Sequence, residues 1–273
     1  MSGPLQVLVD GAPVTADWPL DRSLQYGDGL FETLTVRGGR LRFEALHRAR
    51  LAGGCRRLAL SIDSNALWQT AGELAAAHVE CTLKVLVSRG SSLARGYTPP
   101  PAATPRVMHM VYPPPGAGET PTRVRLATLQ AVLGENPALA GLKHCNRLEQ
   151  VLGRMELQQA SGFEGLMGSS SGTLVSGTMS NVFIGHGGEF VTPVLDQCGV
   201  AGVMRAVVLR EAAQCAVAVR EARVSLAELG DCTAVFITNA RMGVVAAHEL
   251  DGRPLHVPEA VLRLADRVRA LAD

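Results

Sequence analysis

Lysine is scarce in this 273-residue sequence, in which only two of the 26 basic residues, Lys84 and Lys143, are lysines. A guanidinium does not lose its proton to become a nucleophile, whereas an ammonium can. A lysine kept where arginine has taken almost every other basic position is therefore a candidate for amine chemistry. Most lysines in proteins are solvated surface charges, so this candidate needs support from its surroundings.

The sequence also lacks a strong net charge. Its formal net charge of +1 gives no sign of the basic surface by which proteins attract nucleic acids or anionic membranes. An anionic ligand must then be bound by a few local groups rather than by a general field.

Paired cysteines and long apolar runs are missing as well. The six cysteines form no C-x-x-C pair and have no histidines nearby at the spacing of zinc ligands. This argues against a disulfide framework and a metal site, and we expect reduced, mostly buried thiols. No run approaches about 18 apolar residues, and the N-terminus has no basic head followed by an apolar stretch. We therefore expect a cytoplasmic protein without a membrane span.

The composition, 47% hydrophobic and 19% charged, is that of a globular protein, and the length suffices for two domains. We predict an α+β domain at residues 1–114, a linker rich in proline and glycine at 115–121, and a second domain at 122–273. The first domain should contain hairpins over 5–14 and 31–43, helices over 44–59 and 64–78 with Ser64 as N-cap, and strands over 82–88 and 106–112.

The second domain should begin with a strand at 123–130 and a long helix at 144–160. This helix has apolar residues at Leu148, Val151, Leu152 and Met155, the spacing of one helix face, and Lys143 would lie at its N-terminal edge. Further on we expect two short strands within 173–192, a helix after 199–205, strands near 217–224 and 233–239, a hairpin at 251–252 and a last helix from Pro258.

The turn Gly199-x-x-Gly202 precedes one of these helices. Backbone N–H groups at a helix N-terminus favour anions such as phosphate. The turn lacks the lysine of the P-loop and the spacing of the dinucleotide fingerprint, and taken alone it is an ordinary tight turn. Together with an isolated lysine it suggests a phosphorylated cofactor that forms a Schiff base, and pyridoxal phosphate (PLP) fits.

A family resemblance rests on six motifs whose order and spacing are specific together, although each is weak alone. They are Asp21-Arg-Ser-Leu-Gln-Tyr-Gly-Asp-Gly-Leu-Phe-Glu-Thr33, His47-x-x-Arg50-Leu51, Lys84-Val-Leu-Val-Ser-Arg-Gly90 with Arg95-Gly-Tyr97, Asn136-Pro-x-Leu-Ala-Gly-Leu-Lys-His-x-Asn-Arg-Leu-Glu-Gln150, Ser180-Asn-Val-Phe183 and Gly199-Val-x-Gly-Val-Met-Arg205. Nearly the whole chain resembles the fold-type IV PLP enzymes, which include branched-chain and D-amino-acid aminotransferases. Within them the run from Leu142 to Gln150 most resembles the aminodeoxychorismate lyases.

The resemblance implies a two-domain α+β fold with an N-terminal α/β sandwich and a C-terminal β-rich pseudo-barrel with helices. It also implies a homodimer, because the family builds its site at the dimer interface. Lys143 would form the Schiff base and then act as general base. The cofactor phosphate would be bound by a fork of Arg50, the backbone N–H groups of Val203 and Met204, and the turn at Asn239 and Ala240. Arg50 could instead be a solvated helix residue.

The substrate implied by the resemblance is a dicarboxylate, 4-amino-4-deoxychorismate. Candidates for its carboxylates are Arg89 and Arg95, either of which could equally be a loop charge. The pocket would be lined by Tyr26, Phe31 and Tyr97, although aromatics at strand ends are also common in cores. Thr33 would touch the reacting substrate, with plain strand propensity as the rival explanation.

One position departs from the family pattern. The fold-type IV glutamate that pairs with the protonated pyridine nitrogen is replaced here by Ser176. A hydroxyl can donate to a neutral nitrogen but cannot stabilise a positive one by charge, which weakens the electron sink. This favours an elimination driven by aromatisation, giving 4-aminobenzoate and pyruvate, over transamination. Glu164 or another acid could reach the nitrogen instead, and a D-amino-acid or branched-chain aminotransferase or a PLP-binding relic without turnover remain alternatives.

Overall fold

The computed structural model of the chain describes residues 6–13, 20–92, 96–101, 103–116, 121–160 and 162–271. The chain forms two compact units. Among the described residues, unit 1 comprises those within 6–116 together with 142–146, and unit 2 comprises those within 121–141 and 147–271. The short segment 142–146, which the sequence prediction assigned to the second domain, thus belongs to the first unit.

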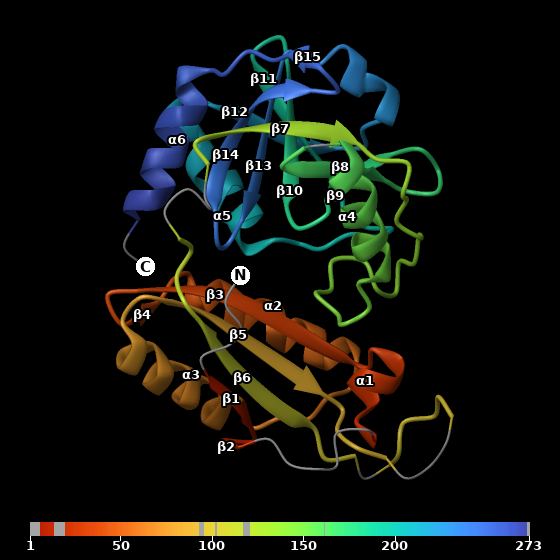
Figure 1. Cartoon of the computed structure of the whole chain (residues 1–273), viewed down its shortest axis with the longest axis vertical. Helices are drawn as coiled ribbons and strands as arrows, with labels where there is room; N and C mark the ends of the chain where they lie inside the picture. The colour runs from red at the N-terminus through yellow and green to blue at the C-terminus, as the bar shows by residue number, and fades with distance from the viewer. Residues whose placement is uncertain are drawn as a thin grey trace. The chain divides into compact units, whose positions relative to one another are not determined.

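Unit 1 is an antiparallel sheet of six strands in the order β2-β1-β6-β5-β3-β4. Helices α2 and α3 lie along one face of this sheet (Figure 1), as expected for an α/β sandwich. The elements are β1 (Gln6–Val9), β2 (Ala12–Pro13), α1 (Arg22–Tyr26), β3 (Gly29–Arg37), β4 (Arg40–Leu41), α2 (Glu44–Arg57), α3 (Ser64–His78), β5 (Cys81–Ser88) and β6 (Arg106–Tyr112). The N-cap of α3 is Asp63, whose carboxylate accepts from Ala66 N at 3.0 Å, so the prediction of Ser64 was wrong by one residue.

Strand β3 separates two environments. Leu30, Glu32, Leu34 and Val36 are buried, while Phe31, Thr33 and Thr35 between them are partly exposed. Side chains alternate between the two faces of a strand, so the buried set and the partly exposed set lie on opposite faces. Glu32 contacts α2, which shows that the buried set faces the helices.

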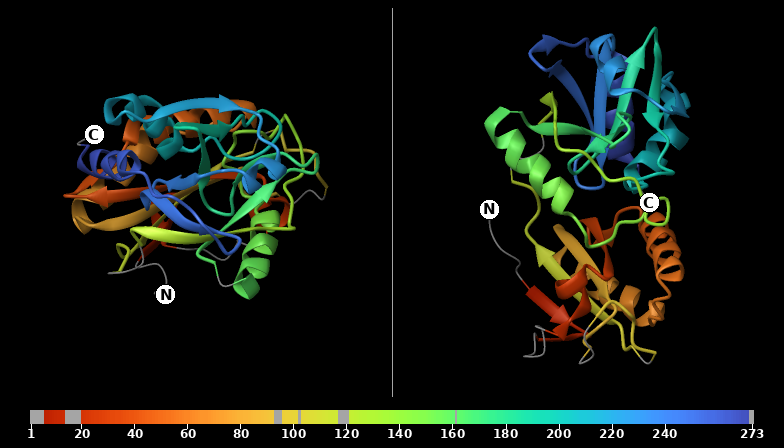
Figure 2. Two further views of the ribbon diagram at one scale, coloured as in Figure 1. Left: turned by 90° about the horizontal axis from the view of Figure 1, so that it is seen from above. Right: turned by 90° about the vertical axis from the view of Figure 1, so that its right-hand side faces the viewer.

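Unit 2 is built on a mixed sheet of nine strands, eight of them in the order β12-β11-β10-β13-β14-β7-β8-β9, with β15 paired to β14. Figure 2 gives two further views of its strands and helices. The strands are β7 (Arg123–Thr128), β8 (Glu164–Gly168), β9 (Leu174–Gly177), β10 (Asn181–His186), β11 (Glu189–Pro193), β12 (Ala218–Ala222), β13 (Ala234–Asn239), β14 (Gly243–Leu250) and β15 (Arg253–Pro254). The helices are α4 (Leu148–Ala160), α5 (Val203–Glu211), η2 (Ala212–Cys215), η3 (Leu226–Gly230) and α6 (Glu259–Ala270). One core lies among β7, β8, β10, β13 and β14, with Leu166, Val182 and Ile237 completely or almost completely buried.

Lys143 does not lie at the edge of a helix as the sequence suggested, because α4 begins only at Leu148. Residues 143–145 are extended and pair with β3 instead. Phe31 N donates to Lys143 O at 2.9 Å, and Cys145 N donates to Gly29 O at 2.9 Å. These bonds to a strand occupy backbone groups that a helix would need, so the helix starts after them.

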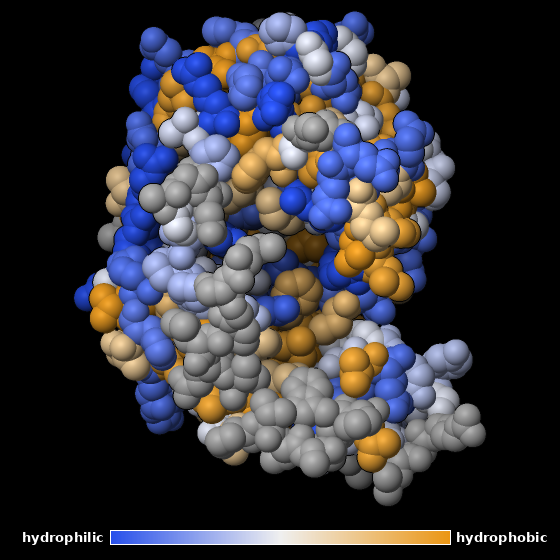
Figure 3. All heavy atoms as spheres, viewed as in Figure 1, coloured by the Kyte–Doolittle hydropathy of each residue, from blue (hydrophilic) through white to orange (hydrophobic). Residues whose placement is uncertain are grey.

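Helix α4 shows its apolar stripe to the outside of the single chain. Leu148, Val151, Leu152 and Met155 are between 50% and 77% exposed, whereas Leu157 is buried at 2%. In the space-filling view, orange surface gathers over α4 (Figure 3). An apolar stripe at helical spacing normally packs on a core, whereas this one is an exposed apolar surface in the single chain.

Within the described part of the chain, no helix is long and apolar enough to cross a membrane. The six cysteines are free thiols, five buried and Cys145 partly exposed.

Candidate active site

The two lysines of the sequence lie over one aromatic ring in unit 1. Lys143 Nζ is 4.3 Å from the centroid of the Phe31 ring, and Lys84 Nζ is 5.0 Å from the same centroid. The face of an aromatic ring attracts a cation, so Phe31 helps to hold both amines on this face of the sheet. The sequence prediction named Phe31 and Lys143 but gave no role to Lys84.

Thr33 shares this face. It lies directly opposite Lys84 in the register of β3 and β5, and it is two residues after Phe31 on the same side of β3. A hydroxyl and two amines therefore lie on one partly exposed patch of the sheet. This arrangement can bind an acidic substrate and move a proton.

Arg50 is fixed by a buried carboxylate on the other side of β3. Its Nε donates to Glu32 Oε1 at 2.8 Å, and its Nη2 donates to Glu32 Oε2. His47, one helical turn earlier on α2, contacts Glu32 Oε2 through Nδ1 at 2.6 Å. The Nε–Nη2 edge of the guanidinium is thus occupied, so a phosphate would meet Arg50 at a different edge from the one used by Glu32.

The charges in this cluster follow from its burial and hydrogen bonds. Burial raises the pKa of the Glu32 carboxyl, but hydrogen bonds from Arg50 and His47 outweigh it and lower the pKa to about 2. Burial lowers the pKa of His47 from its ordinary value of 6.5 in spite of the hydrogen bond to Glu32. At neutral pH Glu32 is ionised and His47 is neutral, which makes His47 Nδ1 the donor to the carboxylate.

In unit 2 the N-terminus of α5 offers backbone donors. Gly202 is the N-cap and provides no side-chain hydrogen bond, so the first N–H groups of the helix, including those of Val203 and Met204, have no side-chain cap. A Cβ at Gly202 would lie 1.9 Å from Asn181 Oδ1, so a larger residue here would require the Asn181 side chain to move. Asn181 in turn donates from Nδ2 to Val200 O at 2.9 Å, which braces the turn before the helix.

The predicted turn at Asn239 and Ala240 follows strand β13. Asn239 Oδ1 accepts from Arg241 N at 3.0 Å and from Met242 N at 2.8 Å, while its Nδ2 donates to Met179 O at 3.2 Å. The side chain of Asn239 therefore shapes the turn itself. Binding of an anion here would fall to backbone groups of the turn.

Ser176 is 7% exposed on β9, and its Oγ donates to Gly177 O at 2.9 Å. To donate to a pyridine nitrogen, the hydroxyl would have to give up this bond.

Glu164, the acid considered as a substitute, is fully buried at the start of β8. Its two oxygens accept from Gly165 N, Thr178 N, Thr178 Oγ1, Met179 N and Ser180 Oγ at distances of 2.5 to 3.1 Å. Five donors saturate a carboxylate, so Glu164 closes the turn between β9 and β10 and has no acceptor position left for a ligand.

The predicted carboxylate ligand Arg89 is engaged elsewhere in unit 1. Its Nε donates to Asp28 Oδ2 at 2.7 Å, its Nη2 donates to Leu58 O at 2.8 Å and its Nη1 donates to Ala59 O at 3.3 Å. Burial raises the pKa of Asp28, but hydrogen bonds from Arg89 and Arg22 overcome this and lower the pKa. All three guanidinium nitrogens thus have partners: Nε bonds Asp28, and Nη1 and Nη2 bond the backbone just after α2, which favours a structural role. Arg95, the other candidate, lies outside the described residues.

The three aromatic residues predicted to line the pocket do not all lie together. Tyr26 and Tyr97 meet edge to face with ring centroids 5.5 Å apart, but Tyr97 is 84% exposed. Arg22 connects them, because it lies over the Tyr26 ring at 4.8 Å and donates from Nη2 to Tyr97 O at 2.8 Å. Of the three predicted aromatics, Phe31 is the one that contacts both lysines.

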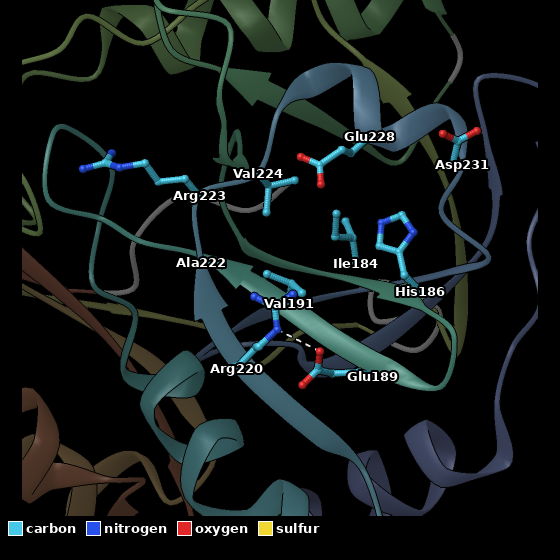
Figure 4. Close-up of a pocket in the computed structure, with 10 residues that line it drawn as sticks. All are labelled: Ile184, His186, Glu189, Val191, Arg220, Ala222, Arg223, Val224, Glu228 and Asp231. Carbon is cyan, nitrogen blue, oxygen red and sulfur yellow. Dashed lines mark hydrogen bonds and ion pairs between the residues drawn. The ribbon is translucent and has the colours of Figure 1, made fainter.

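A separate pocket of about 350 Å³ lies among β10, β11, β12 and η3 (Figure 4). It is lined by Ile184, His186, Glu189, Val191, Arg220, Ala222, Arg223, Val224, Glu228 and Asp231. These residues include no lysine and none of the predicted site residues. Arg220 Nε is bonded to Glu189 Oε2 at 2.8 Å at its rim, so this pocket does not have the chemistry of a Schiff-base site.

Comparison with known proteins adds to this geometry. The model of the class IV aminotransferase family matches residues 29–250. The chain belongs to that family. An aminodeoxychorismate lyase of Vibrio harveyi is 31% identical over 242 residues, which are 86% of this chain and 88% of that protein.

Other similar proteins include both a lyase and an aminotransferase. The crystal structure of 4-amino-4-deoxychorismate lyase from Pseudomonas aeruginosa is 42% identical with a TM-score of 0.90, and the match covers 97% of this chain and 98% of that one. A D-alanine aminotransferase of Bacillus licheniformis is 25% identical over 241 residues, which are 86% of this chain and 83% of that protein. The predicted fold-type IV architecture is confirmed.

Class IV enzymes depend on PLP, and the described residues fit this cofactor. In unit 2, the N-terminus of α5 after Gly202 has backbone N–H groups without a side-chain cap, the type of donor that suits a phosphate. In unit 1, Lys143 has an amine of the kind that an aldehyde needs, and Arg50 has a guanidinium fixed by Glu32. Position 176 still lacks the carboxylate of the family pattern. Glu164, the acid considered as its substitute, already accepts five hydrogen bonds.

Proposed function

We propose that the protein is an aminodeoxychorismate lyase, a PLP-dependent enzyme that removes pyruvate from 4-amino-4-deoxychorismate to give 4-aminobenzoate. The observation that carries this proposal is the placement of Lys143, Lys84 and Thr33 on one face of the sheet over and beside Phe31. The full-length similarity to lyases of Vibrio harveyi and Pseudomonas aeruginosa supports it. Because 4-aminobenzoate is a folate precursor, we place the reaction in folate biosynthesis, in the cytoplasm.

Lys143 has two tasks in this proposal. Its amine would hold the cofactor and, when free in the presence of the substrate, would remove the proton from the ring carbon of the substrate that carries the amine. PLP, when bound, supplies the electron sink for the carbanion. Loss of the neighbouring enolpyruvyl oxygen and protonation of the leaving group give pyruvate and an aromatic ring, and aromatisation makes the step strongly downhill.

Substrate recognition falls to the face of β3 and β5. We propose that Lys84 binds one carboxylate of the substrate, because it is the described cation beside Lys143 and Thr33, whereas Arg89 already donates from all three nitrogens. Arg95 stays a candidate for the second carboxylate. Thr33 would donate to or accept from the reacting part of the substrate.

The phosphate of PLP would be bound by Arg50 and by the N–H groups of Val203 and Met204. The turn at Asn239 and Ala240 would add backbone donors. A positive side chain and the partial positive charge of a helix N-terminus both stabilise a phosphate dianion. Ser176 would face the pyridine nitrogen with a hydroxyl in place of a carboxylate.

The second candidate function is a D-amino-acid or branched-chain aminotransferase, and the 25% identity to a D-alanine aminotransferase supports it. Ser176 argues against it, since transamination depends more strongly on a protonated pyridine nitrogen. A PLP-binding protein without turnover is the third candidate, and only Ser176 supports that one.

One pair of assays separates the three. Purified protein is incubated with aminodeoxychorismate, with release of 4-aminobenzoate and pyruvate measured, and in parallel with 2-oxoglutarate and either D-alanine or L-leucine. A lyase releases both products in the first assay and little glutamate in the second. Turnover in the second assay alone supports an aminotransferase, and turnover in neither supports a relic.

We further propose a homodimer in which the stripe of α4 is part of the interface. Four apolar side chains at the spacing of one helix face are at least half exposed in the single chain. Burying them against a second copy would remove this apolar area from water.

A further inference from the structure

We propose that Glu32 and His47 are positioning residues that preset Arg50 for the phosphate of the cofactor. The inference rests on the proposed function, in which Arg50 binds that phosphate. It assigns a role to two buried polar residues that belong to the family motifs but have no role from the sequence alone.

Glu32 on β3 is hydrogen-bonded by two side chains from one face of α2. Glu32 lies on the face of β3 that packs against α2, and His47 and Arg50 are three residues apart on α2, so both point to the same side of the helix. Glu32 and His47 are 1% and 0% exposed, and the side chain of Arg50 is 14% exposed. Of the three, only Arg50 reaches solvent, where a ligand can meet it.

Both oxygens of Glu32 are used. Oε1 accepts from Arg50 Nε at 2.8 Å, and Oε2 accepts from Arg50 Nη2 and from His47 Nδ1, the latter at 2.6 Å. Two parallel bonds along the Nε–Nη2 edge fix the plane of the guanidinium as well as its position. The hydrogen bond from His47 fixes Glu32 in turn. His47 therefore orients Glu32, and Glu32 orients Arg50.

This arrangement has two opposed effects on a phosphate. The negative charge of Glu32 repels the phosphate and partly neutralises Arg50, which weakens binding. The same carboxylate removes the rotational freedom of a long side chain before the ligand arrives, which strengthens binding. Our proposal is that positioning outweighs repulsion, and this fixes the sign of the result.

The test is a double-mutant cycle read out as PLP affinity. Apoenzyme of the wild type, Glu32→Gln, Arg50→Ala and the double variant is titrated with PLP, and binding is followed by visible absorbance. A glutamine amide would direct N–H donors at Arg50 or His47 and release the guanidinium. We expect Glu32→Gln and Arg50→Ala each to weaken binding by about tenfold or more, and Glu32→Gln to have less than a twofold effect in the Arg50→Ala background.

Three outcomes overturn the proposal. One is tighter or unchanged binding in Glu32→Gln, which would mean that repulsion matches or exceeds positioning. Another is an equal effect of Glu32→Gln with and without Arg50, which would mean general damage to the fold. A wild type that takes up no PLP overturns the proposed function together with this inference, whereas the first two outcomes overturn this inference alone.

A second pair of variants keeps the test decisive if Glu32→Gln does not fold. His47→Asn can retain an N–H donor close to Nδ1, and His47→Phe cannot. We expect His47→Asn to bind PLP within about threefold of the wild type and His47→Phe to follow the loss predicted for Glu32→Gln, provided that far-ultraviolet circular dichroism shows both to be folded. Equal affinities in the two folded variants would contradict the role of His47.

Discussion

The Nζ atoms of Lys84 and Lys143 lie over the same phenyl ring, 5.0 and 4.3 Å from the centroid of Phe31. Because the chain has only these two lysines, we propose that both amines serve one site. The two amines differ in backbone setting, because Lys84 is part of β5 and Lys143 is on the segment that pairs with β3. We therefore expect replacement of Lys84 and replacement of Lys143 to impair different functions of the protein.

Lys84→Met should impair substrate binding and leave the cofactor in place. Loss of a charge-assisted hydrogen bond costs on the order of 1.5–3 kcal/mol, which corresponds to about a tenfold or larger rise in KM for aminodeoxychorismate. Lys84→Arg keeps the charge and should lose less. Steady-state kinetics together with PLP titration measure both effects, and an unchanged KM in Lys84→Met would rule out the carboxylate contact.

Ser176→Glu tests the departure from the family pattern. A carboxylate at this position should raise the proton affinity of the pyridine nitrogen and increase half-transamination relative to lyase turnover. Glu164 does not already supply this charge, because its carboxylate accepts five hydrogen bonds from neighbouring residues. Both activities are measured at saturating PLP on wild type and mutant. Rates that fall together with an unchanged ratio would show that Ser176 only fills space.

Acid should destabilise the protein through its buried histidines. Burial lowers the pKa of both His47 and His109 from the ordinary 6.5. Below pH 6.5 the unfolded chain takes up protons that the folded chain does not, so the free energy of unfolding falls as the pH drops toward the folded pKa values. Each histidine can contribute a slope of at most about 1.4 kcal/mol per pH unit.

The substitution His109→Gln removes the contribution of one histidine to the pH dependence of the free energy of unfolding. Chemical denaturation of wild type and variant between pH 7.5 and 5 should show a smaller loss of stability in the variant. Identical pH dependence in the two proteins would mean that His109 does not contribute to the acid sensitivity.

The stripe on α4 predicts the oligomeric state. Sedimentation velocity should find the wild type as a dimer, and the double substitution Leu152→Glu with Met155→Glu should shift it to monomer at micromolar concentration. Gln158→Glu, an exposed polar position on the same helix, is the matched control and should remain dimeric. A double variant that stays dimeric places the interface elsewhere.

Much of the fold could be predicted from local patterns. The hairpins at Asp10-Gly11 and Asp251-Gly252 follow from turn residues, and the helices of unit 1 follow from apolar periodicity. The short strand β8 and helix α1 were missed, because a buried run such as Glu164–Gly168 has no alternation to reveal it.

The site was harder to predict for a physical reason. Lys143 was identified as an unusual lysine, but the prediction that it lies at the edge of a helix was wrong. Its segment pairs with β3, and this contact joins residues more than one hundred positions apart. Long-range contacts of this kind leave no periodic signal in the sequence. The same holds for Lys84 over Phe31 and for Glu32 between His47 and Arg50. A motif can name residues of this kind, but only the fold shows which of them touch.

We propose above all that Lys143 carries PLP as a covalent adduct. The holoenzyme is reduced with borohydride, digested, and mapped by mass spectrometry, with its visible absorption recorded before and after reduction. We expect a visible band that is lost on reduction and a phosphopyridoxyl mass on the peptide containing Lys143, with Lys84 unmodified. Modification of Lys84 alone, or no modification of protein that holds PLP, would contradict it.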